Sequence, residues 1–453
     1  MVTKVSKIEI VKPLDTSWKV LGEVLRDLQY NTWKIANKGI QIMWDYQKFD
    51  FSYKQQFGEY FKKRNKTLPS GNKSIQTDIA ALTTEWNYMM PGAMKPAIGK
   101  MLEDKWKADQ KKILNGEKSI PSFKRNIPIE LHNTLMMDSK RKPLIYTEKN
   151  GQYTNYNISI ALLSKEYAKS QYERDNGRFL LALAIKDHSQ VTILDRLISG
   201  EYKLSMSKIS YNNRKKKWFF LLTYSFDPVK KELNPENVLG VDLGIKVPAM
   251  LAVNFNSYYQ KTIGDSEEVY AFETQMEKRR KSLQRSRQWA GKGSRGHGRK
   301  TLMKPLEKLG SKQANFKDTK NHTWSKAIID EAIKNECGVI QLENLEGISE
   351  NNLFLKRWTY FDLQQKIIFK AREVGIEVRK INPKYTSARC HKCGHIHLSD
   401  IPKELWRPTQ ENFNCQFCGY KGNADVNAAR NIAIRDIEQI IQAKFNTQVK
   451  GAG

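Results

Sequence analysis

The sequence predicts a multidomain α/β protein, with a helical part and a β-rich part ahead of a layered α/β half. Apolar residues recur at helical spacing between residues 17 and 116, and short runs typical of strands fill residues 120–232. From residue 239 onward, buried strands alternate with helical segments, and glycines occupy the turns. A chain of 453 residues is long enough for two to four domains and for at least one large buried core.

The helical part is expected to follow a short strand. Residues 5–12 alternate between polar and apolar side chains, and Pro13 stops the pattern. A long amphipathic helix is predicted from residue 18 to about residue 46, with further helical segments near 74–90 and 96–114.

The β-rich part is predicted from three apolar runs bounded by turn residues. We expect strands over 158–163 and 179–185, and a hairpin over 204–226 that turns at Asn212 and Asn213.

The charge of the chain indicates a polyanionic partner. Lys and Arg number 77 against 48 Asp and Glu, a formal net charge of +29, which favours association with nucleic acid. A membrane surface is the competing polyanion, but the longest apolar stretches fall far short of the roughly 20 residues that a spanning helix needs. The first residues alternate as a strand and lack the apolar core of a secretory signal, so we expect a cytoplasmic protein.

Three acids lie in apolar surroundings, where a charge is costly unless it is paired or binds a metal. Asp242 and Glu343 each interrupt an apolar strand, and Asp425 lies in the first turn of a helix that Asn423 would cap. Two strand acids and one helix acid can converge above a sheet edge and hold two divalent cations roughly 3.5–4 Å apart. Hard oxygen ligands favour Mg²⁺ or Mn²⁺, and the expected reaction is phosphodiester hydrolysis that leaves a 5′-phosphate and a 3′-hydroxyl.

The residues around Asp242 and Asp425 also suggest how these acids are packed. Gly240 and Gly244 flank Asp242 and would let a ligand approach the backbone. The helix that carries Asp425 is expected to pack on a core through an apolar face formed by Val426, Ala429, Ile432, Ala433, Ile437 and Ile440.

Two other interpretations of the acids are disfavoured. A single acid beside a strand end is more often a solvated or capping residue, but the three together, in an α/β pattern with a basic stretch, favour a metal site. The actin-like ATPase fold also has an Asp followed by glycine on its first strand. The chain has no later glycine-rich phosphate motif of that class.

Four of the five cysteines form two C-x₂-C pairs, Cys390 with Cys393 and Cys415 with Cys418. This spacing is typical of a tetrahedral zinc site, and four thiolates leave no open position, so the zinc would be structural. Two redox pairs are the disfavoured alternative, since a redox dithiol normally occurs once, in a thioredoxin-like unit.

Histidines and a fifth cysteine lie near these motifs. His391, His395 and His397 could replace a cysteine as ligand, but surface histidines beside a zinc loop are the favoured interpretation. Cys337 stands alone beside an apolar run and is expected to be a buried thiol.

A basic stretch over residues 278–300 contains no acid and one tryptophan, Trp289, and is expected to contact nucleic acid. Residues 291–296 match G-x-G-x-x-G, but no strand precedes them, so a dinucleotide site is rejected. Further basic runs at 124–125 and 214–217 would give a second contact surface. The basic residues of the stretch are Lys278, Arg279, Arg280, Lys281, Arg285, Arg287, Lys292, Arg295, Arg299 and Lys300.

With these residues in view, the chain resembles the RNA-guided nucleases of type V. The resemblance rests on Asp242, Glu343, the two cysteine pairs and residues 423–433 (NADVNAARNIA). This half is similar both to transposon-encoded TnpB proteins and to the type V-F miniature CRISPR effector nucleases (Cas-twelve-f). The second group is favoured by residues 8–14 (IEIVKPL), 119–125 (SIPSFKR) and 198–202 (ISGEY).

The resemblance implies an arrangement of domains and roles for four residues. Asp242, Glu343 and Asp425 would be the catalytic acids, and Arg407, eight residues before the third cysteine, would stabilise the scissile phosphate. The implied domains are a β-barrel-like wedge module (1–16 and 120–232), a helical recognition domain (17–119), an RNase H-like (RuvC) nuclease domain (233–384 and 422–453) and an inserted zinc-ribbon target-nucleic-acid-binding domain (385–421).

The resemblance also implies the partners. Pairing with a guide RNA would select the target, while the protein would recognise a short T-rich motif beside it in double-stranded DNA. Family members work as an asymmetric homodimer on one guide RNA. Two other functions are kept open: a TnpB-like nuclease that uses an RNA from a transposon end, and a zinc-ribbon protein that binds nucleic acid without chemistry.

Overall fold

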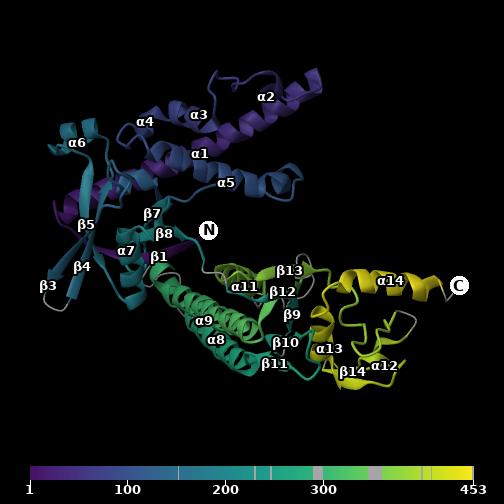
Figure 1. Ribbon diagram of the computed structural model, residues 1–453. Helices are drawn as coiled ribbons and strands as arrows, with labels where there is room; N and C mark the ends of the chain where they lie inside the picture. Colours follow the sequence, from purple (N-terminus) through teal and green to yellow (C-terminus); the bar gives the residue numbers. More distant parts are fainter. Residues whose placement is uncertain are drawn as a thin grey trace. The chain divides into compact units, whose positions relative to one another are not determined.

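The computed structural model divides into two compact units, Met1–Asp227 and Pro228–Gly453 (Figure 1). No helix in the described part of the chain is both long and apolar enough to cross a membrane. The structure describes residues 1–150, 153–228, 231–244, 247–288, 299–344, 360–398, 401–409 and 411–450.

The first unit contains an eight-stranded sheet in which the N-terminal strand is central. β1 pairs antiparallel with β8 on one side and with β5 on the other, and the path β2-β7-β8-β1-β5-β4-β3 stays open at its ends among the described strands. The module expected to be barrel-like is therefore an open sheet. Its strands are β1 (Val2–Pro13), β2 (Ile129–Leu131), β3 (Ile145–Asn150), β4 (Tyr153–Ala161), β5 (Arg178–Ala184), β6 (Lys203–Leu204), β7 (Ser207–Asn212) and β8 (Lys217–Phe226).

The predicted helical part is confirmed between β1 and β2, although its first helix is longer than expected. Ser17 caps that helix through its side chain, and Gly58, at φ 76°, ends it well beyond residue 46. The helices α6 and α7, within the β-rich part, were not predicted. The helices of this unit are α1 (Trp18–Phe57), α2 (Phe61–Arg64), α3 (Ile75–Leu82), α4 (Thr84–Asn87), α5 (Met94–Leu114), α6 (Lys165–Tyr172) and α7 (His188–Ser199).

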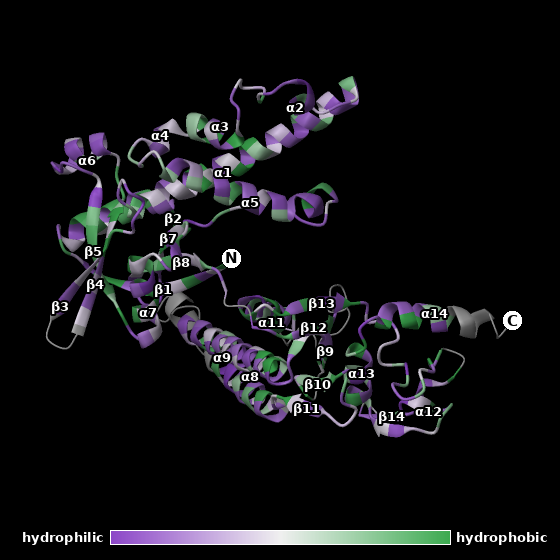
Figure 2. Cartoon of the chain, viewed as in Figure 1, coloured by the Kyte–Doolittle hydropathy of each residue, from purple (hydrophilic) through white to green (hydrophobic). Residues whose placement is uncertain are grey.

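One hydrophobic core joins these helices to the sheet. Leu21, Leu25 and Leu28 on α1 are fully buried, as are Ile158 on β4 and Phe220 on β8. Figure 2 shows the resulting alternation of apolar and polar residues along α1. The predicted recognition and wedge parts therefore share a core.

The second unit contains a five-stranded mixed sheet in the order β11-β10-β9-β12-β13. β9 pairs antiparallel with β10 and parallel with β12, which also runs parallel to β13. This confirms the predicted α/β half. Its strands are β9 (Asn234–Asp242), β10 (Ala249–Val253), β11 (Gln260–Ile263), β12 (Cys337–Glu343) and β13 (Glu377–Ile381), and a small separate sheet pairs β14 (Asn412–Asn414) with β15 (Lys421–Asn423).

Helices cover both faces of this sheet, as the alternation along β10 demonstrates. Leu251 and Val253 belong to the core that includes residues of α9 and α11, whereas Met250 and Ala252 pack with α13. The helices are α8 (Ser266–Gln288), α9 (Arg299–Lys334), α11 (Tyr360–Val374), α12 (Lys403–Trp406), α13 (Ala424–Ile432) and α14 (Ile437–Lys450).

The C-terminal helical segment buries five of the six residues predicted for its apolar face, and only Ile440 departs from the prediction. It breaks after Ile432 into α13 and α14, and Ile440 is 39% exposed while Ile441 is buried. The side-chain Nε2 of Gln341 donates to the carbonyls of Ile432 and Ile434, at 2.7 and 2.9 Å. These bonds satisfy carbonyls that lie beyond the helical ladder and hold the end of α13 against β12.

The missing side chain at Gly240 makes room for the backbone of α13, not for a ligand. A Cβ atom at this position would lie 2.3 Å from the Ala433 nitrogen and 2.4 Å from the Ala429 carbonyl oxygen. The expectation that Gly240 admits a ligand was therefore wrong, because the backbone of α13 fills that space. At Gly244 a Cβ atom would lie 3.0 Å from the Val247 carbonyl oxygen and 3.7 Å from Asp425 Oδ2, so this position is also closely packed.

We predict that Gly240→Ala lowers the free energy of unfolding of the second unit by about 1–3 kcal/mol, because the added methyl group overlaps backbone atoms that cannot rotate away. The measurement is thermal unfolding of the full chain. Gly310→Ala is the matched control, since a Cβ at Gly310 in α9 meets no atom within 4 Å. That change should leave stability the same or slightly higher, because alanine favours helix over glycine. Equal effects of the two changes would contradict the packing role of Gly240.

Candidate functional site

Two of the three predicted acids end neighbouring strands of the five-stranded sheet. Asp242 is the last residue of β9, and Glu343 is the last residue of β12. The two strands are parallel, and Leu342 pairs with Val241, so both carboxylates lie at the same edge. Each acid had been predicted inside a strand, and the structure places each at a strand end.

The third acid reaches this edge from α13. Asn423 caps the helix, and its Oδ1 accepts the backbone N–H groups of Asp425 and Val426 at 2.9 and 3.0 Å. α13 packs on β9 and β10, and the Asp425 carboxylate lies beside Gly244, just beyond the end of β9. The structure thus brings Asp242, Glu343 and Asp425 together.

Electrostatics at this edge disfavour three ionised carboxylates without a cation. Burial raises the pKa of Asp242 well above its ordinary value, and the nearby charges of Glu343 and Asp425 raise it further. Burial also raises the pKa of Glu343, against the opposing effect of a hydrogen bond from Thr386. A divalent cation would reverse these effects, because it stabilises the ionised form of each neighbouring carboxyl group.

The three acids are less closely grouped than the four paired cysteines. Among the residues that the structure describes, the ligand atoms of the four cysteines all lie within 4.8 Å of one another, and the acids form no such group. Carboxylates that share two ions roughly 3.5–4 Å apart need not all approach a single point.

Side chains that the sequence did not reveal surround the acids. The Thr386 hydroxyl donates to Glu343 Oε1 at 2.5 Å, and Gln364 Nε2 donates to the Glu343 carbonyl at 2.7 Å. The Tyr360 hydroxyl donates to the Gly244 carbonyl at 2.8 Å. Burial, and then the charge of Asp242, raise the pKa of Tyr360, so this phenol stays protonated as a donor.

Arg407 also lies near the acids. It follows the short helix α12, between the two cysteine pairs, and its positive charge lowers the pKa of Asp242 against the stronger effects of burial and of the other acids. The structure therefore places Glu343, Asp425 and Arg407 close enough to Asp242 for their charges to change its pKa.

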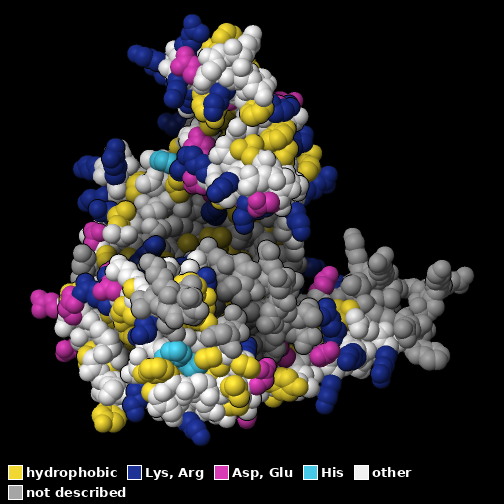
Figure 3. All heavy atoms as spheres, turned by 90° about the vertical axis from the view of Figure 1, so that its right-hand side faces the viewer, with side chains coloured by type: hydrophobic (Ala, Val, Ile, Leu, Met, Phe, Trp, Pro, Cys, Tyr) yellow, Lys and Arg dark blue, Asp and Glu magenta, His cyan; other side chains and the backbone are white. Residues whose placement is uncertain are grey.

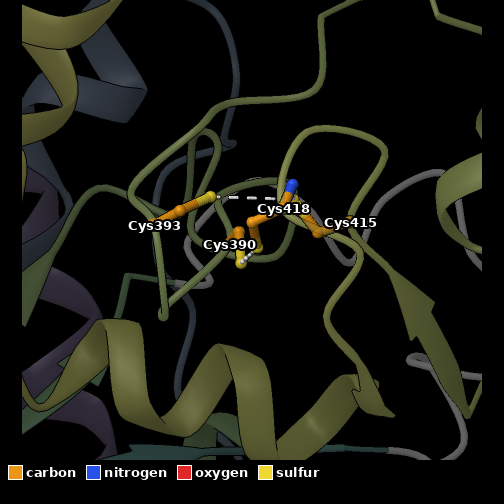
Figure 4. Close-up of side chains that lie close together, drawn as sticks. All are labelled: Cys390, Cys393, Cys415 and Cys418. Atoms are coloured by element: carbon orange, nitrogen blue, oxygen red, sulfur yellow. Dashed lines mark hydrogen bonds between the residues drawn. The ribbon is translucent and has the colours of Figure 1, made fainter.

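The four paired cysteines converge on one point (Figure 4). The Sγ atoms of Cys390 and Cys418 lie 3.8 Å apart, and those of Cys393 and Cys415 lie 3.7 Å apart. A tetrahedral ion with Zn–S bonds of about 2.3 Å separates its sulfurs by roughly 3.8 Å, so these residues fit zinc. A disulfide requires about 2.05 Å, so neither pair is bonded.

The turns behind the cysteines suit thiolate ligands. Gly394 and Gly419 follow the two knuckles at φ 75° and 70°, a conformation that favours glycine. The backbone N–H of Tyr420 is the largest cause that lowers the pKa of Cys418, to about 7. Cys337, in contrast, is fully buried in the sheet core, and burial raises its pKa to about 12. The prediction of a buried thiol at Cys337 is confirmed.

The histidines are structural, and one of them is not on the surface. His397 is only 2% exposed; its Nδ1 donates to the Ala388 carbonyl at 2.8 Å, and its Nε2 accepts the Gln416 N–H at 3.1 Å. The expectation of a surface histidine was wrong for His397, because both ring nitrogens stabilise the ribbon. His395 stacks on the exposed ring of Phe417 with centroids 5.0 Å apart.

A buried hydrogen-bond network joins the ribbon to α13. Asn427 Nδ2 donates to the Arg389 carbonyl at 2.8 Å, and Asn427 Oδ1 accepts the His391 N–H at 2.9 Å. Asn431 Nδ2 donates to the carbonyls of Arg389 and Thr386, at 2.6 and 2.9 Å. Asn427 and Asn431 have no exposed surface. The helix that carries Asp425 is therefore bonded to the first cysteine knuckle and to the segment that carries Thr386.

Part of the predicted basic stretch lies on α8. Lys278, Arg279, Arg280, Lys281 and Arg285 are exposed there. The backbone of Arg287, Arg299 and Lys300 is helical, whereas Lys292, Arg295, Trp289 and the rejected motif at 291–296 lie outside the described residues.

The charge around this stretch is mixed. Arg280 and Lys281 line a groove of about 850 Å³ between α8 and α9, but Glu273, Glu277 and Asp318 line it as well. Figure 3 shows Lys and Arg side chains spread over the visible face, with Asp and Glu among them. On this face the Lys and Arg side chains are therefore spread out rather than gathered in one patch.

Comparison with known proteins gives the family. Residues 360–432 match a family model described as "Cas12f1-like, TNB domain". A CRISPR-associated endodeoxyribonuclease Cas12f1 from Sulfoacidibacillus thermotolerans is 40% identical over 97% of this chain and 98% of its own length. The protein of the same description from Syntrophomonas palmitatica is 35% identical over 78% of this chain and 75% of its own.

A solved structure gives the same fold. The chain in the cryo-EM structure of a Cas12f1-sgRNA-target DNA complex matches with a TM-score of 0.71 and 20% identity, over 96% of this chain and 99% of that one. At that identity the match establishes the multidomain α/β fold alone. Because the relative that is 40% identical is matched over nearly the whole length of both chains, this chain belongs to the Cas12f1 family.

Proposed function

We propose that the chain is an RNA-guided endonuclease of a type V-F CRISPR system that cuts double-stranded DNA beside a short T-rich motif. One observation carries the chemistry: Asp242 is partly buried at a sheet edge where desolvation, Glu343 and Asp425 raise its pKa. The proposal that an RNA guides the nuclease rests on family membership, since the matched relatives are described as CRISPR-associated endodeoxyribonucleases.

The three acids would hold two Mg²⁺ or Mn²⁺ ions in an RNase H-like (RuvC-type) site. When bound, these ions supply a hydroxide-like nucleophile and stabilise the leaving 3′ oxygen. Thr386 orients the Glu343 carboxylate by its hydrogen bond, and the Asn423 cap holds Asp425 at the start of α13. Arg407, close enough to affect Asp242, would bind the scissile phosphate.

The cysteine cluster would hold one structural zinc ion within an inserted target-nucleic-acid-binding ribbon over residues 385–421. The ribbon is hydrogen-bonded to Asn427 and Asn431 of α13, so an ordered ribbon would help to fix the position of Asp425 on the same helix. Residues 17–119 would form the recognition domain, residues 1–16 and 120–232 the wedge, and residues 233–384 and 422–453 the nuclease. The exposed cations of α8 would contact nucleic-acid phosphates.

A TnpB-like nuclease would use the same acids, so the source of the bound RNA separates the two proposals. A zinc-ribbon protein without chemistry is disfavoured, because partly buried, mutually repelling acids are costly in a protein that does not use them. We further propose that two chains assemble on one guide RNA.

We expect Asp242→Asn and Glu343→Gln each to slow cleavage of a guide-matched duplex by roughly 100-fold or more. A metal site contributes several kcal/mol to the transition state, and each 1.4 kcal/mol is about tenfold. Guide-dependent binding of the duplex should persist. Asp436→Asn, at an exposed acid between α13 and α14, is the control and should cut at the wild-type rate. Cleavage that survives in either acid variant would refute the site.

Although Asp242→Asn should impair cleavage, we expect it to stabilise the fold when no metal is bound. A carboxyl group whose pKa is raised in the folded state stabilises that state at low pH. This stabilisation is lost as the pH rises from the ordinary pKa of the group toward its raised pKa in the folded state. In metal-free buffer at neutral pH, we expect Asp242→Asn to unfold at a higher temperature than the wild type. A lower unfolding temperature would contradict the repulsion among the acids.

We expect Cys415→Ser to remove most of the zinc from the purified chain, because a tetrahedral structural site needs four strong ligands. Zinc content per chain is measured by elemental analysis. Cys337→Ala is the matched control, since Cys337 lies in the sheet core outside the cluster, and it should keep the wild-type zinc content. Undiminished zinc in Cys415→Ser would exclude the cysteine site.

The chain expressed with its flanking locus should purify with RNA, and sequencing of that RNA tests the proposed function. Repeat-spacer RNA with a structured scaffold is the expected result, in a particle whose mass corresponds to two chains and one RNA. RNA from a transposon end would favour the TnpB-like function instead. The absence of any enriched RNA would overturn the guided function.

A further inference from the structure

The first unit contains a concave pocket of about 640 Å³, within the range of about 300–1,000 Å³ that holds small ligands. Its walls come from three separate segments of the chain. Arg26 and Gln29 come from α1, Lys124 and Arg125 from the segment before β2, and Tyr211 and Trp218 from the β7–β8 hairpin. The basic run at 124–125 thus meets the aromatic side chains of the hairpin at one pocket.

The charge of the pocket is positive and unbalanced. Arg26, Lys124 and Arg125 are exposed, and no carboxylate is among the described residues that line the pocket. No ion pair joins these three cations to an acid in the described part of the chain. Other cations of the same unit are paired: Lys208 lies 2.8 Å from Glu130, and Lys217 pairs with Glu9. A concave site with unneutralised cations attracts an anion.

The segment that supplies two of these cations is held in place before any ligand binds. Trp33 Nε1 donates to the Phe123 carbonyl at 2.8 Å, and Asn37 Oδ1 accepts the Phe123 N–H at 2.9 Å. At the other end, Gln29 Nε2 donates to the Ile127 carbonyl at 2.9 Å. The Arg125 guanidinium lies over the Trp33 ring, 5.1 Å from its centroid. Such preorganisation lowers the entropy cost of binding.

The pocket also offers an aromatic surface. Tyr211 and Trp218 contact each other with ring centroids 5.0 Å apart, and Tyr211 is partly exposed while Trp218 is 6% exposed. An aromatic ring beside cations is the combination that binds a nucleobase together with its phosphate. A base inside a duplex has both faces covered by its neighbours, so a ring in a pocket can stack only on an unpaired or extruded base.

We propose that this pocket binds one unpaired nucleotide, with its phosphate against Arg26, Lys124 and Arg125 and its base against Tyr211. This inference rests on the proposed RNA-guided function and names a partner contact outside the nuclease site. Two strands can supply such a nucleotide: the guide RNA and a DNA strand freed when the guide pairs with its target.

The test compares two pocket variants with two matched controls in the full-length chain. Tyr211→Leu removes the ring, and Arg125→Ala removes a phosphate contact. Tyr146→Leu on the edge strand β3 makes the same aromatic change, and Lys140→Ala likewise removes one positive charge, both at exposed positions outside the pocket. Binding of the copurified RNA, and binding of a guide-matched duplex by the RNA-loaded complex, are measured over a range of salt concentrations in the Asp242→Asn background. Cleavage is therefore not part of the measurement.

We expect Tyr211→Leu to weaken binding by roughly 5- to 100-fold, and Arg125→Ala to lower the salt slope of log K by about one. Weaker RNA binding assigns the nucleotide to the guide, whereas normal RNA binding with weaker duplex binding assigns it to DNA. Affinities and salt slopes equal to those of the two controls would refute nucleotide binding by the pocket. The proposed nuclease function would not be affected by that result. A wild-type chain that binds no RNA would overturn the proposed function, and the pocket assignment with it.

Discussion

The arrangement of the second unit depends on the cost of placing three carboxylates at one edge of a buried sheet. Asp242 is partly buried, its desolvation raises its pKa, and its like-charged neighbours Glu343 and Asp425 raise that pKa further. Such a cluster is unfavourable in isolation, and a pair of divalent cations would turn it into a favourable one. The parallel pairing of β9 with β12 sets the two strand acids side by side. The absence of a side chain at Gly240 lets α13 bring the third acid against them.

The ribbon and the acids form one structural system rather than two independent features. Buried amides on α13 bond to the backbone of the first cysteine knuckle, and Asn431 also bonds to the carbonyl of Thr386, whose hydroxyl donates to Glu343. A metal that orders the ribbon therefore also orders the segment beside Glu343 and the helix of Asp425. Inserting the ribbon immediately before α13 couples its folding to the geometry of the acids. The first unit has its own core and carries separate cationic surfaces.

Local patterns predicted the family, the α/β half, the cysteine cluster and the cap at Asn423, because each depends on residues close together in the sequence. Features that depend on contacts between distant segments were missed. Thr386 is far in sequence from Glu343, and Gly240 is far from Ala433, so neither spacing indicates that the pair meets. The length of α1 was underestimated because its second half buries few side chains, yet the helix continues until Gly58 ends it. His397 appeared polar and exposed in sequence, but both its ring nitrogens have partners inside the ribbon.

The central claim is that these acids support guided, metal-dependent hydrolysis, and end-group analysis of cleavage products tests it most directly. The purified chain with its copurified RNA is incubated with a duplex that matches the guide and with one that does not. We predict cleavage of the matched duplex alone, only when Mg²⁺ or Mn²⁺ is present, with 5′-phosphate and 3′-hydroxyl ends. Cleavage that persists in EDTA, that ignores the guide, or that leaves 3′-phosphate ends would contradict the account.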